Sequence, residues 1–279
     1  MPDHLQCGRF RLSLERPLVM GIVNVTPDSF SDGNAHFQAD QAIAHARLLV
    51  EEGADLLDIG GESTRPGAQA VPADEELRRI LPVIESLRDC GVPLSVDTCK
   101  PSVMQAALAA GADMINDIGG FSAPGAIEAV ADADCALCLM HMRGEPRTMQ
   151  DAPSYDDVVA EIHDYLHQGA RRLRQAGIAA DRIVLDPGFG FGKTVEHNYT
   201  LLRLLPQAVG QEYPSLLGVS RKSMIGAVTG RPPSRRLGGS VAAALAGAVR
   251  GAHILRVHDV ADTVDALRVW SAVEQGVRA

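Results

Sequence analysis

One short segment of the chain combines an acid, alternating glycines and two aromatic rings. It runs from Asp186 to Lys193 as Asp-Pro-Gly-Phe-Gly-Phe-Gly-Lys, and it follows an apolar run at 181–185 with the pattern of a buried strand. Glycine lets backbone approach a ligand because it has no Cβ, and phenylalanine offers a flat apolar face to a planar ring. We expect Asp186 to accept hydrogen bonds from such a ring and so to fix its orientation.

A plainer interpretation of this segment stays open. A glycine-rich turn whose aspartate is satisfied by backbone N–H groups has the same residue types. The segment fits neither common phosphate loop, because a Walker A loop needs glycine where Pro187 stands, and G-x-G-x-x-G starting at Gly188 needs glycine in place of Lys193. By itself the segment therefore leaves a ring-binding site and an ordinary turn as alternatives.

Other apolar runs are also followed by side chains able to bind or catalyse. These residues are Asn24, Glu62, Thr64, Arg65, Asp97, Asn116, Asp117, Met140, His141, Ser220, Arg221, Lys222, Arg256 and His258. Each has an alternative structural role: Asn24 as a loop cap, His258 as a helix cap and, in the first segment, Phe191 as a core residue. Whether they form one site depends on the elements that hold them.

Those elements alternate along the chain. Strand-like apolar runs cover residues 18–24, 55–59, 93–97, 113–117, 136–141, 182–186, 215–220 and 253–257. Helical periodicity covers residues 40–52, 74–87 with Asp74 as its expected cap, 102–110, 124–131, 156–176, 196–205, 236–250 and 259–273. Glycines at 53, 91, 111, 177 and 251 follow helices, where a left-handed stop is expected.

This alternation predicts the fold class. Continuously apolar strands indicate a parallel sheet buried on both faces, and eight βα units in about 250 residues favour a closed (β/α)8 barrel over an open sheet. We expect one domain over residues 1–279, with a short hairpin at 5–14 on the barrel floor. Functional residues of such barrels lie at the carboxyl ends of the strands, so we interpret the residues that follow the strands as one site.

Composition limits the class of partner. The 279 residues carry a net charge of −9, which argues against general nucleic-acid binding but permits a local basic cluster for an anionic substrate. No apolar run reaches the roughly 18 residues of a membrane span, and the first residues do not resemble a signal peptide, so we expect a cytoplasmic protein. The pair Cys135 and Cys138 has C-x-x-C spacing but lies in an apolar run without a second pair, so we interpret both as reduced core cysteines.

Three loops have distinctive composition. Residues 25–34 and 60–67 are rich in Gly, Ser, Thr and Asp, and we expect them to close over a substrate, with ordinary surface loops as the alternative. Residues 229–236 are basic, which indicates a solvated connection or a contact with a partner subunit.

Taken together, the motifs resemble those of the dihydropteroate synthases, a folate-pathway family inhibited by sulfonamides. The matching segments are 21–33, 58–67, 96–98, 115–117, 139–142, 186–193, 219–222 and 256–258. They reach from the first predicted strand to the last. One departure is Asn34, where the family commonly has a second glycine, and this difference concerns the flexibility of loop 25–34.

The resemblance implies a reaction and a set of residues. The family joins 6-hydroxymethyl-7,8-dihydropterin diphosphate to 4-aminobenzoate and releases diphosphate through a dissociative mechanism. The implied pterin contacts are Asp97, Asn116, Met140, Asp186, Lys222 and Arg256. The implied 4-aminobenzoate contacts are Phe30, Thr64, Arg65, Pro66, Phe191 and Ser223. The implied diphosphate contacts are Asn24, Arg65, Arg256 and His258, with Mg²⁺ held through the amide oxygen of Asn24.

The implied catalytic residues are Asn24, Arg65, Lys222, Arg256 and His258. We assign no general base, because an aromatic amine is already neutral at physiological pH. The resemblance also implies a homodimer through the late barrel helices, where 242–248 is rich in small residues. The alternatives are a pterin-binding methyltransferase barrel, which has no use for the diphosphate cluster, and a pterin-binding paralogue without catalysis.

Overall fold

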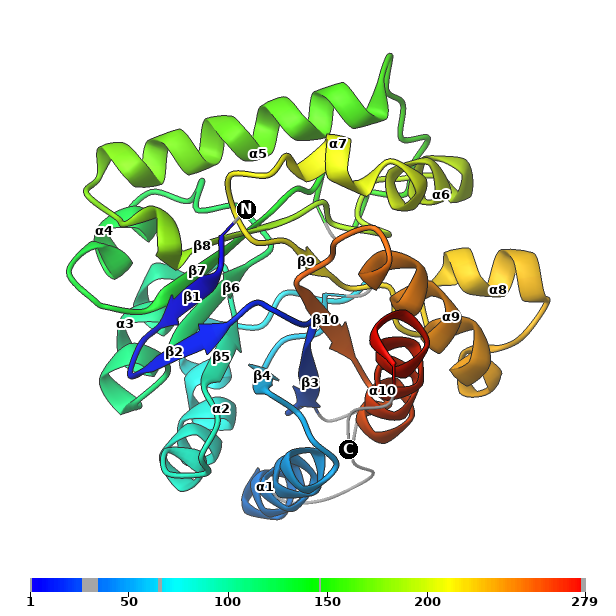
Figure 1. Cartoon of the computed structure of the whole chain (residues 1–279). Coiled ribbons are helices and arrows are strands. Elements are labelled where there is room, and N and C mark those ends of the chain that lie inside the picture. Colours follow the sequence, from blue (N-terminus) through cyan, green and yellow to red (C-terminus); the bar gives the residue numbers. More distant parts are fainter. Residues whose placement is uncertain (1, 27–34, 65–66, 146, 277–279) are drawn as a thin grey trace.

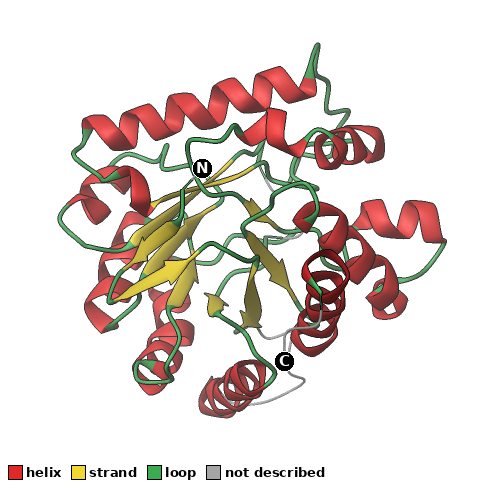
Figure 2. Ribbon diagram, in the orientation of Figure 1, coloured by secondary structure: helices red, strands yellow, loops and turns green. Residues whose placement is uncertain are grey.

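The structure is a computed structural model that describes residues 2–26, 35–64, 67–145 and 147–276. Figure 1 shows the course of the chain, and Figure 2 shows strands in the centre with helices around them. The strands are β1 (His4–Cys7), β2 (Phe10–Ser13), β3 (Leu18–Asn24), β4 (Leu56–Gly60), β5 (Leu94–Asp97), β6 (Met114–Asp117), β7 (Ala136–Met140), β8 (Ile183–Asp186), β9 (Leu216–Leu217) and β10 (Ile254–Val257). The helices are α1 (Ala35–Glu51), α2 (Ala73–Leu87), α3 (Pro101–Ala110), α4 (Ala126–Ala131), α5 (Val158–Gln175), α6 (Val195–Arg203), α7 (Leu205–Val209), α8 (Ser223–Thr229), α9 (Leu237–Ala248) and α10 (Val260–Gln275).

The last eight strands form the predicted barrel. Strands β3 to β8 pair in chain order, and β10 lies between β3 and β9, all of them parallel. The ring is completed where β8 meets the segment before β9, through a parallel bridge of Leu185 with Ser215 and a 2.9 Å hydrogen bond from Leu185 N to Pro214 O. The prediction of a (β/α)8 barrel is confirmed.

The amino-terminal hairpin covers one end of this barrel. Strands β1 and β2 pair in antiparallel register, and Figure 1 shows them lying across the barrel opening. Leu5 and Cys7 are fully buried against inward-facing residues of the barrel, among them Met20, Leu56 and Met114. The predicted floor hairpin is therefore confirmed, and it closes the end of the barrel opposite to the carboxyl ends of the strands.

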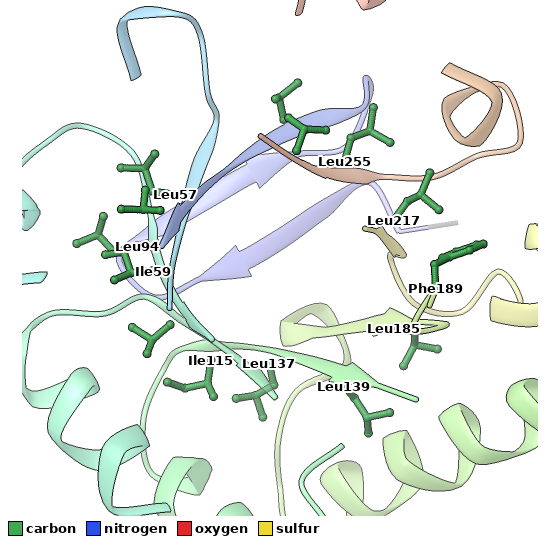
Figure 3. Close-up of a cluster of buried hydrophobic side chains, with 14 of the residues drawn as sticks. Leu57, Ile59, Leu94, Ile115, Leu137, Leu139, Leu185, Phe189, Leu217 and Leu255 are labelled. Atoms are coloured by element: carbon green, nitrogen blue, oxygen red, sulfur yellow. The ribbon is translucent and has the colours of Figure 1, made fainter. Parts of the chain in front are cut away.

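Alternation along the strands separates two kinds of surface. In β4, Leu57 and Ile59 point outward and pack against the helices, as do the other outward leucines and isoleucines in Figure 3. The intervening residues Leu56 and Asp58 point into the barrel, the first among floor residues and the second closer to the carboxyl end. Apolar contacts therefore hold the barrel together from outside, while part of its interior is available to polar groups.

Helix boundaries differ from the prediction at several places. Helix α2 begins at Ala73 with Pro72 at its N-cap and no side-chain cap, so Asp74 lies in the first turn and the predicted cap is wrong. The predicted helix 196–205 corresponds to α6, which ends at Arg203, and a separate short helix, α7, begins at Leu205 with a proline in its first turn. Helix α8 was not predicted, and the predicted strand 215–220 is a strand only at β9, with Ser215 adding the single bridge to Leu185. All five predicted glycine stops have positive φ, between 84° and 113°.

Candidate active site

The carboxyl ends of neighbouring strands place polar side chains at matching heights inside the barrel. In the strand register Asp58 pairs with Ser95, and Asp97 pairs with Asn116. All four side chains are buried. Because inward positions alternate with outward ones, these residues face a common interior above the apolar floor.

One arginine from β10, which is separated from β4 by β3 alone, joins this group. Arg256, on β10, donates from Nε to Asp58 Oδ2 at 2.5 Å and from Nη2 to Asp97 Oδ2 at 3.0 Å. Asp58 also accepts from Ser95 Oγ at 2.6 Å and from Asn116 Nδ2 at 3.2 Å. The network satisfies the charge of the half-buried arginine and orients both the amide of Asn116 and the carboxylate of Asp97.

Asp58 was not among the predicted site residues. Barrel site residues are expected at strand ends, whereas Asp58 lies within β4 and has no exposed surface. The signal was present, because a charged side chain inside an apolar strand is almost never fully buried without a partner. Period-two alternation with Leu57 and Ile59 would have placed it inside the barrel.

Two buried oxygens in this network have no hydrogen-bond partner in the described part of the chain. They are Asp97 Oδ1 and Asn116 Oδ1. A buried acceptor left unpaired costs about 1–3 kcal/mol, and binding sites commonly retain such groups for a ligand to satisfy. The amide nitrogen of Asn116 is already committed to Asp58, so its oxygen is the atom presented to a ligand. Both oxygens call for donors, as on the edge of a ring bearing N–H and amino groups.

The pKa values of the acidic residues in the site depend on their burial and on the positive charge of Arg256. Burial raises the pKa of Asp97 to about 7, although Arg256 acts in the opposite direction. Burial also raises the pKa of Asp186, while Lys222 and Arg256 are among the groups that counteract it. Burial disfavours the charge of Arg256, but Asp58 and Asp97 outweigh that effect and raise its pKa above the ordinary value. Asp186 and Arg256 each favour the charged form of the other.

The segment that follows β8 forms one wall of the site. Asp186 Oδ1 accepts from Gly188 N at 2.7 Å, so one of its oxygens serves the turn, as the plainer interpretation expected. Lys222 donates to Phe189 O and lies 4.6 Å above the ring of Phe191. Burial lowers the pKa of Lys222 to about 8, and Asp186 opposes that shift.

The two phenylalanines of this segment have different roles. Phe191 packs with Ile118 and Met140 beside the site. Phe189 is fully buried in the core between strands and helices, as Figure 3 shows. The expectation that both rings present faces to a ligand is therefore wrong for Phe189, because its side chain points outward from the barrel.

The remaining predicted residues are spread around the rim. Asn24 ends β3 and is half-buried, and His258 Nδ1 lies 3.0 Å from Ser220 Oγ. Thr64 lines a cavity of about 420 Å³ that also includes Asp97. Ser223 is the first residue of α8, directly after Lys222, and is exposed. The predictions for Phe30, Arg65 and Pro66, and for most of loop 25–34, fall outside the described residues.

Two of the polar strand-end residues serve the protein itself. Asp117 accepts from Gly119 N at 2.7 Å and from Phe121 N at 2.8 Å, so it holds the loop after β6. Arg221 forms an ion pair with Asp259 at the rim. Neither side chain is needed to explain a ligand contact.

The donor set limits how a metal ion could be held. Within the described part of the chain, no group of three or more His, Cys, Asp or Glu side chains could hold a metal ion. A hard cation that takes most of its oxygens from phosphate and water fits these residues, since Mg²⁺ commonly needs few protein ligands beside a phosphate. The cysteine interpretation agrees with the structure, in which Cys135 and Cys138 are buried free thiols.

Fold and site together define a class of protein, a (β/α)8 barrel with buried carboxylate and amide groups held by an arginine. Such groups suit a ring that carries N–H and amino groups. Comparisons with known proteins agree with this class. A family model described as "Pterin binding enzyme" matches residues 20–258. Among the described helices, none is both long enough and apolar enough to cross a lipid bilayer.

Similar proteins narrow the class. The dihydropteroate synthase of Escherichia coli (strain K12) is 52% identical over 262 residues, which cover 94% of this chain and 93% of that protein. The crystal structure of Burkholderia cenocepacia dihydropteroate synthase with 7,8-dihydropteroate has 59% identity and a TM-score of 0.91, covering 98% and 97% of the two chains. The Yersinia pestis enzyme in complex with a sulfonamide drug has 50% identity and a TM-score of 0.92, covering 97% and 99%. The chain belongs to the dihydropteroate synthase family, whose members are transferases.

Proposed function

We propose that this protein condenses 6-hydroxymethyl-7,8-dihydropterin diphosphate with 4-aminobenzoate to give 7,8-dihydropteroate and diphosphate. The observation that carries the proposal is the pair of buried acceptors Asp97 Oδ1 and Asn116 Oδ1, which have no hydrogen-bond partner among the described residues. The pterin edge carries an amino group and a ring N–H, which are the donors these oxygens lack. A ring without those donors would leave the acceptors unpaired, and the site would reject it.

The pterin contacts extend beyond that edge. We propose that Asp97, Asn116 and Asp186 accept hydrogen bonds from the amino and N–H groups of the pterin. Lys222 then donates to the edge of the pterin that carries its carbonyl oxygen and ring nitrogen. The guanidinium of Arg256 is held in place by Asp58 and Asp97, and its planar group can stack on a ring or bind an oxyanion. Met140 supplies an apolar contact beside Phe191.

The leaving diphosphate requires positive charge as the C–O bond breaks. We assign Asn24, Arg65, Arg256 and His258 to this role, since the polar strand ends put Asn24 and His258 on the same rim as Arg256. Mg²⁺, when bound, would add charge to the diphosphate, with the amide oxygen of Asn24 as its protein ligand. The protein's contribution is then mainly electrostatic support of the leaving group and exclusion of water.

The amine that attacks the pterin methylene needs its own pocket. We assign it to Phe30, Thr64, Arg65, Pro66, Phe191 and Ser223. Support comes from Thr64, which lines the same cavity as Asp97, and from Phe191, whose ring lies under Lys222. Sulfonamides resemble 4-aminobenzoate, so we expect them to compete for this pocket, as the Yersinia pestis complex illustrates for that enzyme.

We further propose that residues 1–279 are a single domain, that the enzyme is a homodimer, and that it works in the cytoplasm. The first proposal is supported by the continuous barrel core. The second is supported by exposed valines on the late helices, and the third by five cysteines that are all free thiols.

A turnover assay tests the function. The purified protein, given the pterin diphosphate, 4-aminobenzoate and Mg²⁺, should release diphosphate and 7,8-dihydropteroate in equal amounts. Omitting either substrate should abolish formation of dihydropteroate. A protein that binds the pterin but forms no dihydropteroate would be the non-catalytic paralogue, and the proposal would fail.

A further inference from the structure

Lys193 has no role in the function proposed so far, yet it is one of the most deeply buried charged residues. Its side chain is 3% exposed, and its Nζ contacts three groups. These are Gly188 O at 2.8 Å, Phe191 O at 2.9 Å and His141 Nδ1 at 3.0 Å. An amino group buried this deeply needs all of its partners, so this arrangement is specific.

His141 is placed to form a hydrogen bond with this amine through Nδ1. Burial lowers the pKa of His141 to about 2, so its imidazole is neutral at physiological pH. Its backbone N–H donates to Asp186 O at 3.0 Å and joins the end of β7 to the end of β8. The edge of the Tyr165 ring lies against it, with ring centroids 4.9 Å apart. Lys193 is therefore anchored to a fixed part of the barrel.

The segment that Lys193 holds also carries groups of the pterin site. Gly188 N donates to Asp186 Oδ1, and Phe189 O accepts from Lys222. The ring of Phe191 lies beneath the same Lys222 amine. Lys193 thus contacts the carbonyls at both ends of a four-residue arc, and that arc contacts Asp186 and Lys222.

We infer that Lys193 is a positioning residue: with His141, it fixes the 188–191 arc so that Asp186 and Lys222 stay directed at the pterin ring. This inference rests on the proposed function in one respect, namely that the bound ring is a pterin. Lys193 itself does not touch the substrate in this assignment, and its effect passes through the arc.

The sequence offers a direct way to observe this effect, because its lysines are Lys100, Lys193 and Lys222 alone. Isotope labelling of lysine side chains therefore gives three NMR signals, which single substitutions assign. In the wild-type protein the Lys222 signal should titrate near pH 8, as its lowered pKa requires. In Lys193→Met the arc loosens, Lys222 gains solvent, and its titration midpoint should rise toward 10.5. Pterin affinity, measured by calorimetry, should fall roughly tenfold or more, the size typical of losing a partner that orients a binding group.

Two isosteric variants of His141 provide the matched control. His141→Asn keeps a polar group near the position of Nδ1, so Lys222 should titrate as in the wild type. His141→Leu has nearly the same size but no polar group, so it should behave like Lys193→Met. If burying an unpaired group prevents folding, the double variant Lys193→Met/His141→Leu replaces both partners by apolar groups and removes that difficulty.

The outcomes separate the possibilities. Lower thermal stability with wild-type Lys222 titration and wild-type pterin affinity in Lys193→Met and in the double variant would mean a purely structural lysine and would overturn the inference. Equal behaviour of the Asn and Leu variants would overturn it as well. Failure of the proposed function would appear separately, as a wild-type protein that forms no dihydropteroate, while the Lys222 titration remains measurable.

Discussion

At the residue scale, the candidate site depends on two buried carboxylates, Asp58 and Asp97, that form ion pairs with Arg256. The amide of Asn116 joins them through Asp58. Asp58 supplies the charge that holds Arg256 and Asn116, which leaves Asp97 Oδ1 and Asn116 Oδ1 for a ligand. Asp58 thus supports the proposed recognition edge without being part of it. Removing one partner of such a network leaves another buried charge uncompensated, so the residues act as a unit.

The first prediction at this scale concerns Asp186. Replacing it with alanine should weaken pterin binding by at least about a hundredfold, because the ring donors lose a charged acceptor in a site built to pair them. Calorimetric titration with the pterin measures this, and circular dichroism checks the fold. Asp181→Ala is the control and should bind the pterin normally, because Asp181 lies before β8, at the opposite end of that strand from Asp186, and is partly exposed. Unchanged pterin affinity in Asp186→Ala would refute the assignment.

The second prediction concerns the pH dependence that Asp97 creates. Burial raises its folded-state pKa to about 7, whereas an unfolded aspartate titrates near pH 4. Between these values the folded protein holds a proton that the unfolded chain has released. This carboxyl therefore lowers the free energy of unfolding as the pH rises from about 4 to about 7, and the effect levels off above that.

Urea unfolding at a series of pH values tests this sign. The wild-type protein should lose stability relative to Asp97→Asn as the pH rises through this range. Pterin affinity should change in the opposite direction, since the ionised carboxylate is the better acceptor, and should strengthen as the pH passes about 7. Parallel stability curves for the two proteins would show that Asp97 has an ordinary pKa.

At the scale of elements, the segment after β8 and the hairpin show how local geometry positions the site. The segment turns sharply because Gly188, Gly190 and Gly192 all have positive φ. A Cβ at Gly188 would lie 1.9 Å from His141 O, so no other residue fits there. The hairpin instead seals the floor with Leu5 and leaves the carboxyl ends of the strands open to substrate.

Two glycine variants separate close packing from backbone strain. Gly188 and Gly230 have nearly equal φ, 69° and 66°, but an added Cβ at Gly230 meets nothing within 4 Å. Gly230→Ala should therefore lose only about 1 kcal/mol of stability, the usual left-handed penalty. Gly188→Ala should lose several times as much and bind pterin weakly. Equal unfolding free energies for the two variants, measured in urea, would contradict this explanation.

At the scale of the whole molecule, one side of the barrel has an unusual surface. Helices α8, α9 and α10 lie together in Figure 1, and Val228, Val249, Val269 and Val273 near them are each more than 60% exposed. Exposed apolar residues gathered on neighbouring helices are a feature of interfaces between proteins. This surface supports the proposed homodimer. Of the basic loop, residues 229–235 are exposed, which fits a solvated connection and leaves a contact with a partner open.

The corresponding prediction is that the protein sediments as a dimer. Val269 and Val273 lie one turn apart on α10 and therefore share a face. Replacing both by glutamate should shift the sedimentation coefficient to that of a monomer, because charge would be buried in the interface. Val195→Glu, on α6, is the control and should leave the dimer intact. A monomeric wild-type protein would refute the proposal.

The sequence by itself determined the barrel and the strand ends at which most of the candidate site residues lie. Strand and helix periods follow from which side chains must be buried, and polar residues at strand ends follow from the parallel topology, so Asp97, Asn116, Asp186 and Arg256 were predictable. The glycine stops were predictable because only glycine readily takes a left-handed backbone.

Tertiary structure decided what depends on contacts between distant strands. The pairing of Arg256 with Asp58 joins residues 198 positions apart, and no local pattern encodes that distance. The same holds for Lys193 with His141 and for the burial of Phe189, since the direction of each side chain depends on the turn before it. Sequence periodicity reports which residues are buried, whereas partner identity depends on how the barrel closes.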